Sequence, residues 1–158
     1  MSNFSRSRTR KFLYQMLYAS TFSKIDIESF RESFFSGVFE SNLDEEYLKN
    51  MYDLIIKNES FLINLIQKYA PKFDIENMDL SYVLPIFICS TEIFLYSEEI
   101  PTKVSLNEAI EISKIYGDDS SRKTVNGVLN NILNDLEELK TKLNDFKENG
   151  NEKTLFKK

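Results

Sequence analysis

The sequence predicts an all-α fold of about seven helices, which could form two small bundles. Apolar residues recur three and four positions apart along most of the chain, which is the spacing of helices with one buried face. Only four glycines and three prolines occur among 158 residues, which leaves little turn chemistry for an all-β fold. This length and an apolar fraction of 42% indicate a single domain with a sizeable core.

Capping residues, glycine and proline define the ends of the expected helices. The expected ranges are 6–22, 27–39, 44–57, 60–69, 79–96 and 103–116, followed by a long seventh helix with apolar residues from Val125 to Phe146. The fifth helix is apolar on nearly all sides and should therefore be central. Within it, Cys89 is best explained as a small core residue, and Glu92 should be paired or lie at an edge.

The end of the chain carries two further expectations. Beyond Leu136 the seventh helix keeps a coiled-coil-like spacing, so it could extend past the domain and form a homodimer. Residues 147–158 contain four lysines, two glutamates and few apolar side chains, which is typical of a disordered tail. We therefore place one helical domain at 1–146 and a disordered tail after it.

The composition argues against an enzyme and against a cofactor. The sequence has no histidine, which removes the usual general base and the commonest metal ligand, and one cysteine, which excludes a disulfide framework or a cysteine-based zinc site. Its glycines match no phosphate-binding motif. Acidic pairs are better explained as solvated loop or cap residues than as catalytic carboxylates. With no signal peptide and no apolar run of membrane-spanning length, we expect a cytoplasmic protein without membrane contact.

Charge is distributed unevenly along the chain. The net charge is −5, yet the first 25 residues contain five basic and no acidic side chains, namely Arg6, Arg8, Arg10, Lys11 and Lys24. Positive charge at a helix N-terminus opposes the helix dipole, so these arginines should serve a ligand rather than the helix. A localised anion-binding face, with RNA as one candidate ligand, is the functional interpretation, and a solvated basic arm is the alternative.

The stretch from Ile100 to Leu133 is the most informative part of the sequence. Thr102 or Ser105 could cap its first helix, and Gly117 should end that helix in a left-handed conformation. Asp118, Asp119 or Ser120 could then cap the next helix. From the residues alone, packing at the edge of the core explains Tyr18 and Tyr116 slightly better than base stacking does.

Two regions resemble the NusB family of transcription antitermination factors. The shared residues are Pro101, Val104, Asn107-Glu108-Ala109, Tyr116-Gly117-Asp118-Asp119, Ser121-Arg122-Lys123 and Val125-Asn126-Gly127-Val128-Leu129, together with Arg6-x-Arg8-x-Arg10 and Gln15-x-Leu17-Tyr18 near the N-terminus. The resemblance implies an all-α fold of two packed three-helix bundles with an extra helix. It also implies a non-enzymatic protein that binds the boxA element of ribosomal RNA transcripts, together with the small-subunit ribosomal protein NusE, in an RNA polymerase antitermination complex.

The residues themselves suggest two groups for an RNA site. One is the basic arm of Arg6, Arg8, Arg10 and Lys11 beside Tyr14 and Tyr18, and the other is a cluster of Lys103, Tyr116, Arg122 and Lys123, with Asp118 and Ser120 as acceptors for base edges. The resemblance implies that the basic arm and Tyr18 bind RNA together with the turn after Tyr116. The partner surface would lie around Glu76, Asp79 and Tyr82. Three departures from the family pattern affect the site: Thr124 replaces a frequent phenylalanine, Ser120 replaces an acid, and Phe87 replaces a usual arginine and puts an ion pair in doubt.

Two other classes of protein remain as alternatives. The first is the RNA-binding helical domain related to that of an RNA methyltransferase, which would require a cofactor-binding glycine motif that this sequence lacks. The second is a helical scaffold that dimerises through the seventh helix.

Overall fold

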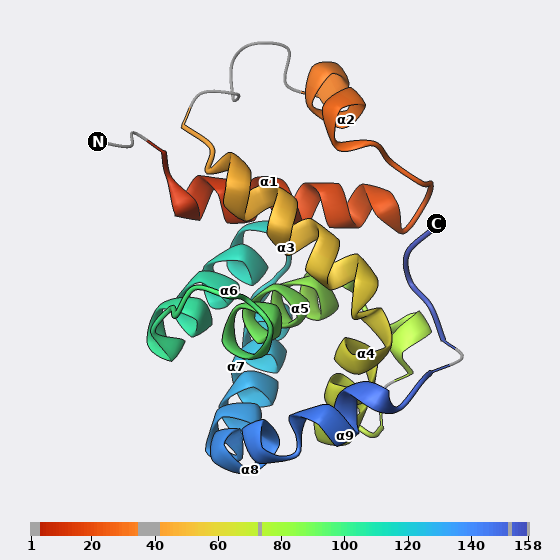
Figure 1. Ribbon diagram of the computed structural model, residues 1–158, viewed down its shortest axis with the longest axis vertical. Coiled ribbons are helices and arrows are strands. Elements are labelled where there is room, and N and C mark those ends of the chain that lie inside the picture. Colours follow the sequence, from red (N-terminus) through yellow and green to blue (C-terminus); the bar gives the residue numbers. More distant parts are fainter. Residues whose placement is uncertain (1–3, 35–41, 73, 152, 158) are drawn as a thin grey trace.

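The computed structural model describes residues 4–34, 42–72, 74–151 and 153–157. These residues form nine α-helices and one short 3₁₀ helix and contain no strand (Figure 1), which confirms the all-α prediction. The elements are α1 (Arg6–Ser20), α2 (Ile27–Phe34), α3 (Glu45–Lys57), α4 (Glu59–Tyr69), η1 (Ile75–Asn77), α5 (Leu80–Phe94), α6 (Thr102–Tyr116), α7 (Asp119–Asn134), α8 (Leu136–Thr141) and α9 (Leu143–Glu148). The expected second helix continued to residue 39, and its last part lies outside the described residues. Within the described ranges, no helix is long and apolar enough to cross a membrane.

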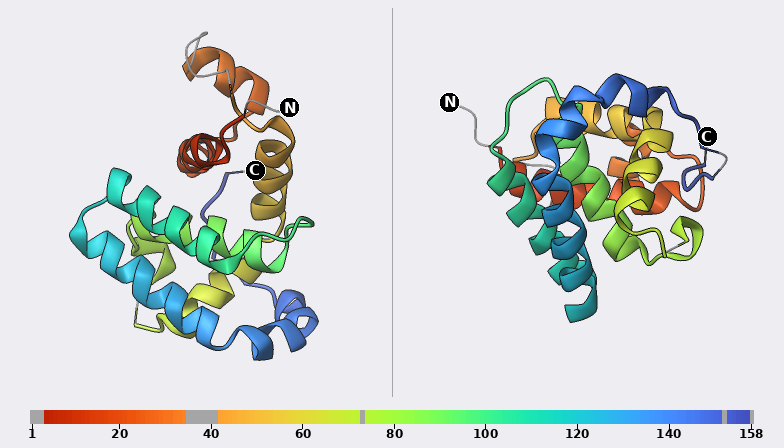
Figure 2. Two further views of the ribbon diagram at one scale, coloured as in Figure 1. Left: turned by 90° about the vertical axis from the view of Figure 1, so that its left-hand side faces the viewer. Right: turned by 90° about the horizontal axis from the view of Figure 1, so that it is seen from below.

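Helix α5 is the centre of the fold, as its apolar sequence predicts. It contacts α6 and α7 on one side and α1, α3 and α4 on the other. Helices α6 and α7 run side by side in opposite directions and complete a three-helix bundle with α5 (Figure 2). Cys89 is buried in this core, and burial raises the pKa of its thiol. The free cysteine is therefore a packing residue.

Local side-chain caps start several helices where the sequence predicts them. Asp44 caps α3 by accepting a hydrogen bond from the Tyr47 amide at 3.1 Å. Asp118 caps α7 in a reciprocal arrangement: its Oδ1 accepts from the Ser121 amide at 2.9 Å, and Ser121 Oγ accepts from the Asp118 amide at 3.2 Å. The expected cap of α6 is wrong, because Pro101 occupies the N-cap position and Ser105 lies inside the helix.

Gly117 ends α6 for a different reason from the one that the sequence suggests. Its φ of −122° and ψ of −153° are extended, not left-handed. A Cβ atom at this position would lie 2.4 Å from Ser121 Oγ and 2.9 Å from the Ser113 carbonyl oxygen. Glycine is therefore required because the end of α6 approaches the cap of α7 too closely for a side chain.

The prediction of one long seventh helix is wrong. Asparagine and aspartate compete for backbone hydrogen bonds and favour helix ends, and α7 ends at Asn134 within such a stretch. Asp135 accepts a hydrogen bond from Tyr69 Oη at 2.7 Å, which holds the break against α4. Leu139 is buried, and Phe146 packs edge-on against Phe61 of α4 with ring centroids 5.7 Å apart. The apolar spacing after Leu136 therefore serves packing within the chain and offers no projecting helix for a homodimer.

The C-terminal segment differs from the expectation of a disordered tail. The buried carboxylate of Glu59 accepts hydrogen bonds from the amides of Leu155 and Phe156 at 2.8 and 2.9 Å and from Thr154 Oγ1 at 2.8 Å. Satisfying a buried carboxylate with three donors fixes the path of this segment across α4.

Phe156 anchors the same segment in the core. Its side chain is 3% exposed and lies against Phe87, with ring centroids 6.1 Å apart. The next residue, Lys157, donates its amide hydrogen to the Ser20 carbonyl at 2.8 Å, so the chain returns to the C-terminal end of α1 (Figure 1). Phe87, where the family usually has an arginine, thus packs against a ring from the tail.

Candidate nucleic-acid interface

Arg10 forms a buried ion pair and is not available to a ligand. Its side chain is 4% exposed, and its Nε and Nη2 donate to Glu92 of α5 at 2.6 and 3.1 Å. Burial disfavours the charged guanidinium, but the hydrogen bond and charge of Glu92 outweigh it and raise the Arg10 pKa. Tyr47 and Ser105 also donate to the Glu92 carboxylate, the second at 2.7 Å. Glu92 is therefore paired, as predicted, and its partner is an arginine of α1.

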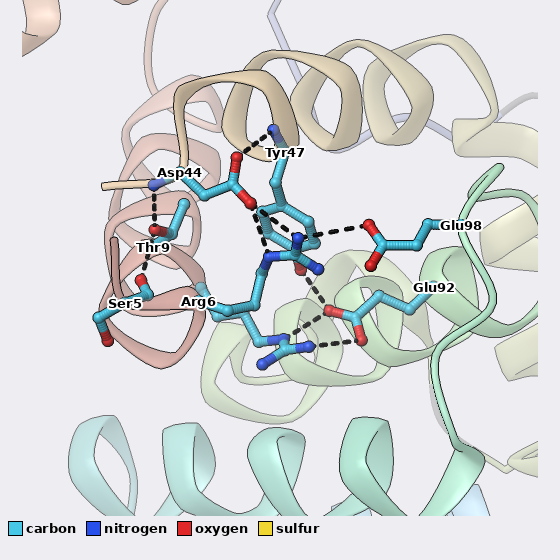
Figure 3. A network of polar contacts seen from close by, with 8 residues as sticks. Ser5, Arg6, Thr9, Asp44, Tyr47, Glu92 and Glu98 are labelled. Carbon is cyan, nitrogen blue, oxygen red and sulfur yellow. Dashed lines mark hydrogen bonds and ion pairs between the residues drawn. The ribbon is translucent and has the colours of Figure 1, made fainter. Parts of the chain in front are cut away.

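Arg6 is also held by carboxylates of the protein (Figure 3). Its Nε and Nη2 donate to Asp44 at 3.0 and 2.7 Å, and Nη2 also reaches Glu98 at 3.3 Å. The guanidinium carbon lies 4.4 Å from the centroid of the Tyr47 ring, a cation–π distance. Arg6 thus ties the start of α1 to the cap of α3 and to the loop between α5 and α6.

These contacts correct the prediction for the arginine-rich start of α1. Opposition to the helix dipole did indicate that the arginines serve another group, but for Arg6 and Arg10 that group is a carboxylate in the same chain. Only Arg8 and Lys11 remain as cations for a ligand. Neither forms an ion pair within the described part of the chain, and the Arg8 side chain is exposed.

One face of α1 and the turn after it gather cationic and aromatic side chains. We call this the α1 face; its residues are Arg8, Lys11, Gln15, Tyr18 and Phe22, spaced three and four apart. Tyr18 and Phe22 are 43% and 67% exposed, and their ring centroids are 5.4 Å apart. Large aromatic side chains with this exposure are candidates for contact with a partner.

A stack of two tyrosines brings the end of α6 to the α1 face. Tyr116, the last residue of α6, stacks on Tyr14 of α1 with ring centroids 4.4 Å apart and an interplanar angle of 15°. The ring centroid of Tyr14 in turn lies 6.2 Å from that of Tyr18. Burial, together with the negative charge of Asp79 at the start of α5, raises the pKa of Tyr14, so this ring is neutral at physiological pH.

The turn between α6 and α7 adds further polar groups beside this stack. We call residues 117–123 the signature turn. Among the described residues the ion pair of Arg122 is an exposed contact with Asp119 at 3.6 Å, and Lys123 and Ser120 are exposed. Asp118 is exposed, but its carboxylate caps α7, and the hydrogen bonds from Ser121 lower its pKa.

Lys103 does not belong to the signature turn. It is exposed in the first turn of α6, whereas Tyr116 ends that helix. Thirteen residues of α-helix separate the two by about 20 Å. The expected cluster of Lys103 with Tyr116, Arg122 and Lys123 is therefore not formed.

The residues expected to bind a protein partner lie at the start of α5. Glu76 is exposed in η1, and Asp79 is exposed and caps α5 by accepting from the Ser81 amide at 2.9 Å. Tyr82 is half-buried. Ser81 Oγ lies 2.9 Å from Ser121 Oγ, so the start of α5 directly adjoins the signature turn.

Comparison with known proteins agrees with this architecture. The profile of the NusB family matches residues 7–134, which is most of the chain. The chain belongs to the NusB family. The match ends with α7, so α8, α9 and the docked C-terminal segment lie beyond it.

Individual relatives give the same assignment to this NusB-family chain. The transcription antitermination protein NusB of Clostridium kluyveri is 32% identical over 147 residues, covering 83% of this chain and 94% of the relative. The NusB protein of Clostridium acetobutylicum is 29% identical and covers 85% and 98%. The solved structure of T. maritima NusB has a TM-score of 0.64 and 27% identity and covers 85% of this chain and 93% of that one.

Sequence reasoning missed two residues of the candidate interface in this NusB-family protein, Phe22 and Gln15, whereas it placed Tyr14 beside the basic arm. Tyr14 and Phe22 lie four residues to either side of Tyr18, a spacing that places rings next to each other on a helix. Gln15 donates from Nε2 to Tyr116 Oη at 2.7 Å. The helical spacing of the rings was visible in the sequence, but the contact between Gln15 and Tyr116 spans 101 positions and was not.

Proposed function

We propose that this protein binds single-stranded, boxA-like RNA of ribosomal RNA transcripts and acts with NusE in an RNA polymerase antitermination complex. Membership of the NusB transcription antitermination family supports the biological role. The stack of Tyr116 on Tyr14 is the observation that carries the RNA site, because it joins the signature turn to the α1 face.

The chemistry of the joined surface suits single-stranded RNA. Cations bind phosphates, and exposed rings stack on unpaired bases. Arg8, Lys11, Arg122 and Lys123 supply four cations that are free or only weakly paired within the described residues. Tyr18 supplies an exposed ring. The RNA site is therefore revised: Arg6 and Arg10 leave it, and the exposed hydroxyl of Ser120 remains a candidate contact.

The adjacent start of α5 is the proposed surface for NusE. Glu76 and Asp79 are exposed acids there, and a basic ribosomal protein would complement them. Because Ser81 contacts Ser121, RNA and NusE would bind next to each other. Replacing Glu76 by lysine should weaken complex formation in a pull-down with NusE, whereas the added positive charge should leave the RNA affinity of the isolated protein at least as high as that of the parent.

RNA binding is tested by titration of fluorescent boxA RNA with a variant that lacks two cations of the α1 face. Arg8→Ala combined with Lys11→Ala should weaken binding strongly. The matched control combines Lys49→Ala with Lys57→Ala, which removes the same charge from exposed positions on α3. Equal affinities of the two double variants would show that the α1 face is not the RNA site. A triple variant that replaces Arg6, Arg8 and Arg10 by alanine is unsuitable for this test, because loss of the ion pairs of Arg6 and Arg10 would disrupt the fold.

The salt dependence gives an independent measure of the same contacts. Four phosphate contacts with a single strand predict a slope of log affinity against log salt of about −3. Loss of two cations should reduce the slope to about −1.4.

A further inference from the structure

We infer that a pocket beside Tyr116 receives one unstacked RNA base and that Phe22 stacks on the neighbouring base. This inference rests on the proposed RNA function and specifies how the α1 face reads the strand. Four rings form an unbroken row, which we call the aromatic row: Tyr116, Tyr14, Tyr18 and Phe22.

The pocket lies at the inner half of the aromatic row. It has a volume of about 560 Å³ and is lined by Tyr14, Gln15, Tyr18, Ala19 and Tyr116. This volume falls within the range of small-molecule sites, and three of its five lining residues are tyrosines. Flat apolar walls of this kind suit the face of a nucleobase.

A polar group without a partner lies at the same place. The Gln15 amide donates from Nε2 to Tyr116 Oη, whereas its Oε1 is buried and accepts no hydrogen bond from any described residue. An unsatisfied buried acceptor is costly and usually has a reason. The exocyclic amino group of adenine or cytosine is a donor that could reach Oε1 when the base enters the pocket.

Phe22 extends the row beyond the pocket. It follows the C-terminal end of α1 and is the most exposed large apolar side chain of the described residues. Among the described residues its ring pairs with Tyr18, and its 67% exposure leaves much of the side chain open to a partner. Because Arg8 and Lys11 lie on the same face, the surface combines phosphate-binding and base-stacking groups along one line, which favours a nucleic acid strand over an apolar protein segment.

The test combines RNA scanning with two variants of the full chain. A boxA-like RNA carries an abasic nucleotide at each position in turn, and each RNA is titrated with the parent, Gln15→Leu and Phe22→Leu. Leucine keeps an apolar side chain but removes the amide or the aromatic face. Val104→Ala, at an exposed position one helix length from the pocket, is the control and should bind like the parent.

The expected result is a specific pattern of coupling. Phe22→Leu should weaken binding of the intact RNA about five- to 150-fold. With the one RNA that lacks the base stacked on Phe22, parent and Phe22→Leu should bind equally well. At the adjacent position, removal of the exocyclic amino group should weaken parent binding about two- to twelvefold and should have no effect in Gln15→Leu. Phe22→Trp should bind about as tightly as the parent, because it keeps the aromatic face that Phe22→Leu removes.

Three other results would overturn the inference, and they separate it from the proposed function. If the parent binds no RNA, both the RNA function and the base pocket are wrong. If the parent binds RNA but the loss of affinity from each protein variant is the same with every abasic RNA, only the base pocket is wrong. If Phe22→Leu binds RNA like the parent but loses NusE in a pull-down, the outer end of the row is a protein surface.

Discussion

The buried ion pair between Arg10 and Glu92 offers the sharpest test of the revised interpretation of α1. Arg10→Met removes the cation and leaves the Glu92 carboxylate, which is 1% exposed, with only the donors of Tyr47 and Ser105. Breaking a buried pair by removing one partner costs about 3–5 kcal/mol. Against a typical stability of about 5–15 kcal/mol, this is a large fraction.

Glu92→Gln should also destabilise the protein by several kcal/mol, because it leaves the buried Arg10 cation with the longer contact to Glu108, at 3.9 Å, as its ion pair among the described residues. The double variant should lose no more than either single variant. In it neither charge remains, and the glutamine carbonyl can still accept hydrogen bonds from Tyr47 and Ser105. The coupling energy between Arg10 and Glu92 should therefore be at least about 2 kcal/mol.

Urea unfolding measures these differences. With a urea dependence of about 2 kcal/mol per molar, each single variant should lower the midpoint by about 2 M. Arg8→Met is the control on the same helix and should change stability by less than about 0.5 kcal/mol, because Arg8 is exposed. If Arg10→Met matches this control, or if the two single losses add in the double variant, Arg10 is not the buried partner of Glu92.

Three further predictions concern other parts of the fold. Phe156→Ala should lower the unfolding free energy by up to about 3–5 kcal/mol and speed hydrogen exchange at the Leu155 amide; unchanged exchange would mean that Phe156 does not anchor the C-terminal segment. Gly117→Ala should destabilise by about 1–3 kcal/mol in thermal unfolding, because its Cβ would clash with Ser121; a neutral result would refute the close approach. Hydrogen bonds to Asp118 lower its pKa in the folded protein. Its contribution to the free energy of unfolding is therefore complete above the pKa of the unfolded chain, about 4, and is lost as the pH falls from there through the lower pKa of the folded protein. Asp118→Asn should keep the cap but remove this loss of stability at acid pH. If stability depends on pH in the same way in both proteins, the result would count against the cap.

The sequence was most informative where structure is decided locally. The caps at Asp44 and Asp118 depend on a side chain and an amide three residues later, so the sequence narrowed each cap to a few neighbouring residues, among them Asn42 for the first and Asp119 and Ser120 for the second. The central position of α5 followed from its apolar residues on all sides. The family assignment also followed from short runs of adjacent residues around Gly117.

The sequence was less informative where distant segments meet. Helical spacing places Arg6 and Arg10 on one face and Arg8 on another. Arg10 and Glu92 are 82 positions apart, however, so nothing local showed that the face of Arg10 is the buried one and that Arg8 is exposed. Likewise, Glu59 and Phe156 hold the C-terminal segment, and a composition average over twelve residues conceals both the buried phenylalanine and its distant carboxylate partner. For the RNA site, charge counting overestimated the arginine-rich start of α1, and helical spacing would have indicated Phe22.

The central claim is that the α1 face and the signature turn form one RNA surface, and salt-dependent titration with boxA RNA tests it most directly. The parent is compared with Arg8→Ala/Lys11→Ala and with Arg122→Ala/Lys123→Ala. If both segments contact the same strand, each double variant should reduce the salt slope from about −3 to about −1.4. A slope that changes for one pair only, or for neither, would contradict a shared surface.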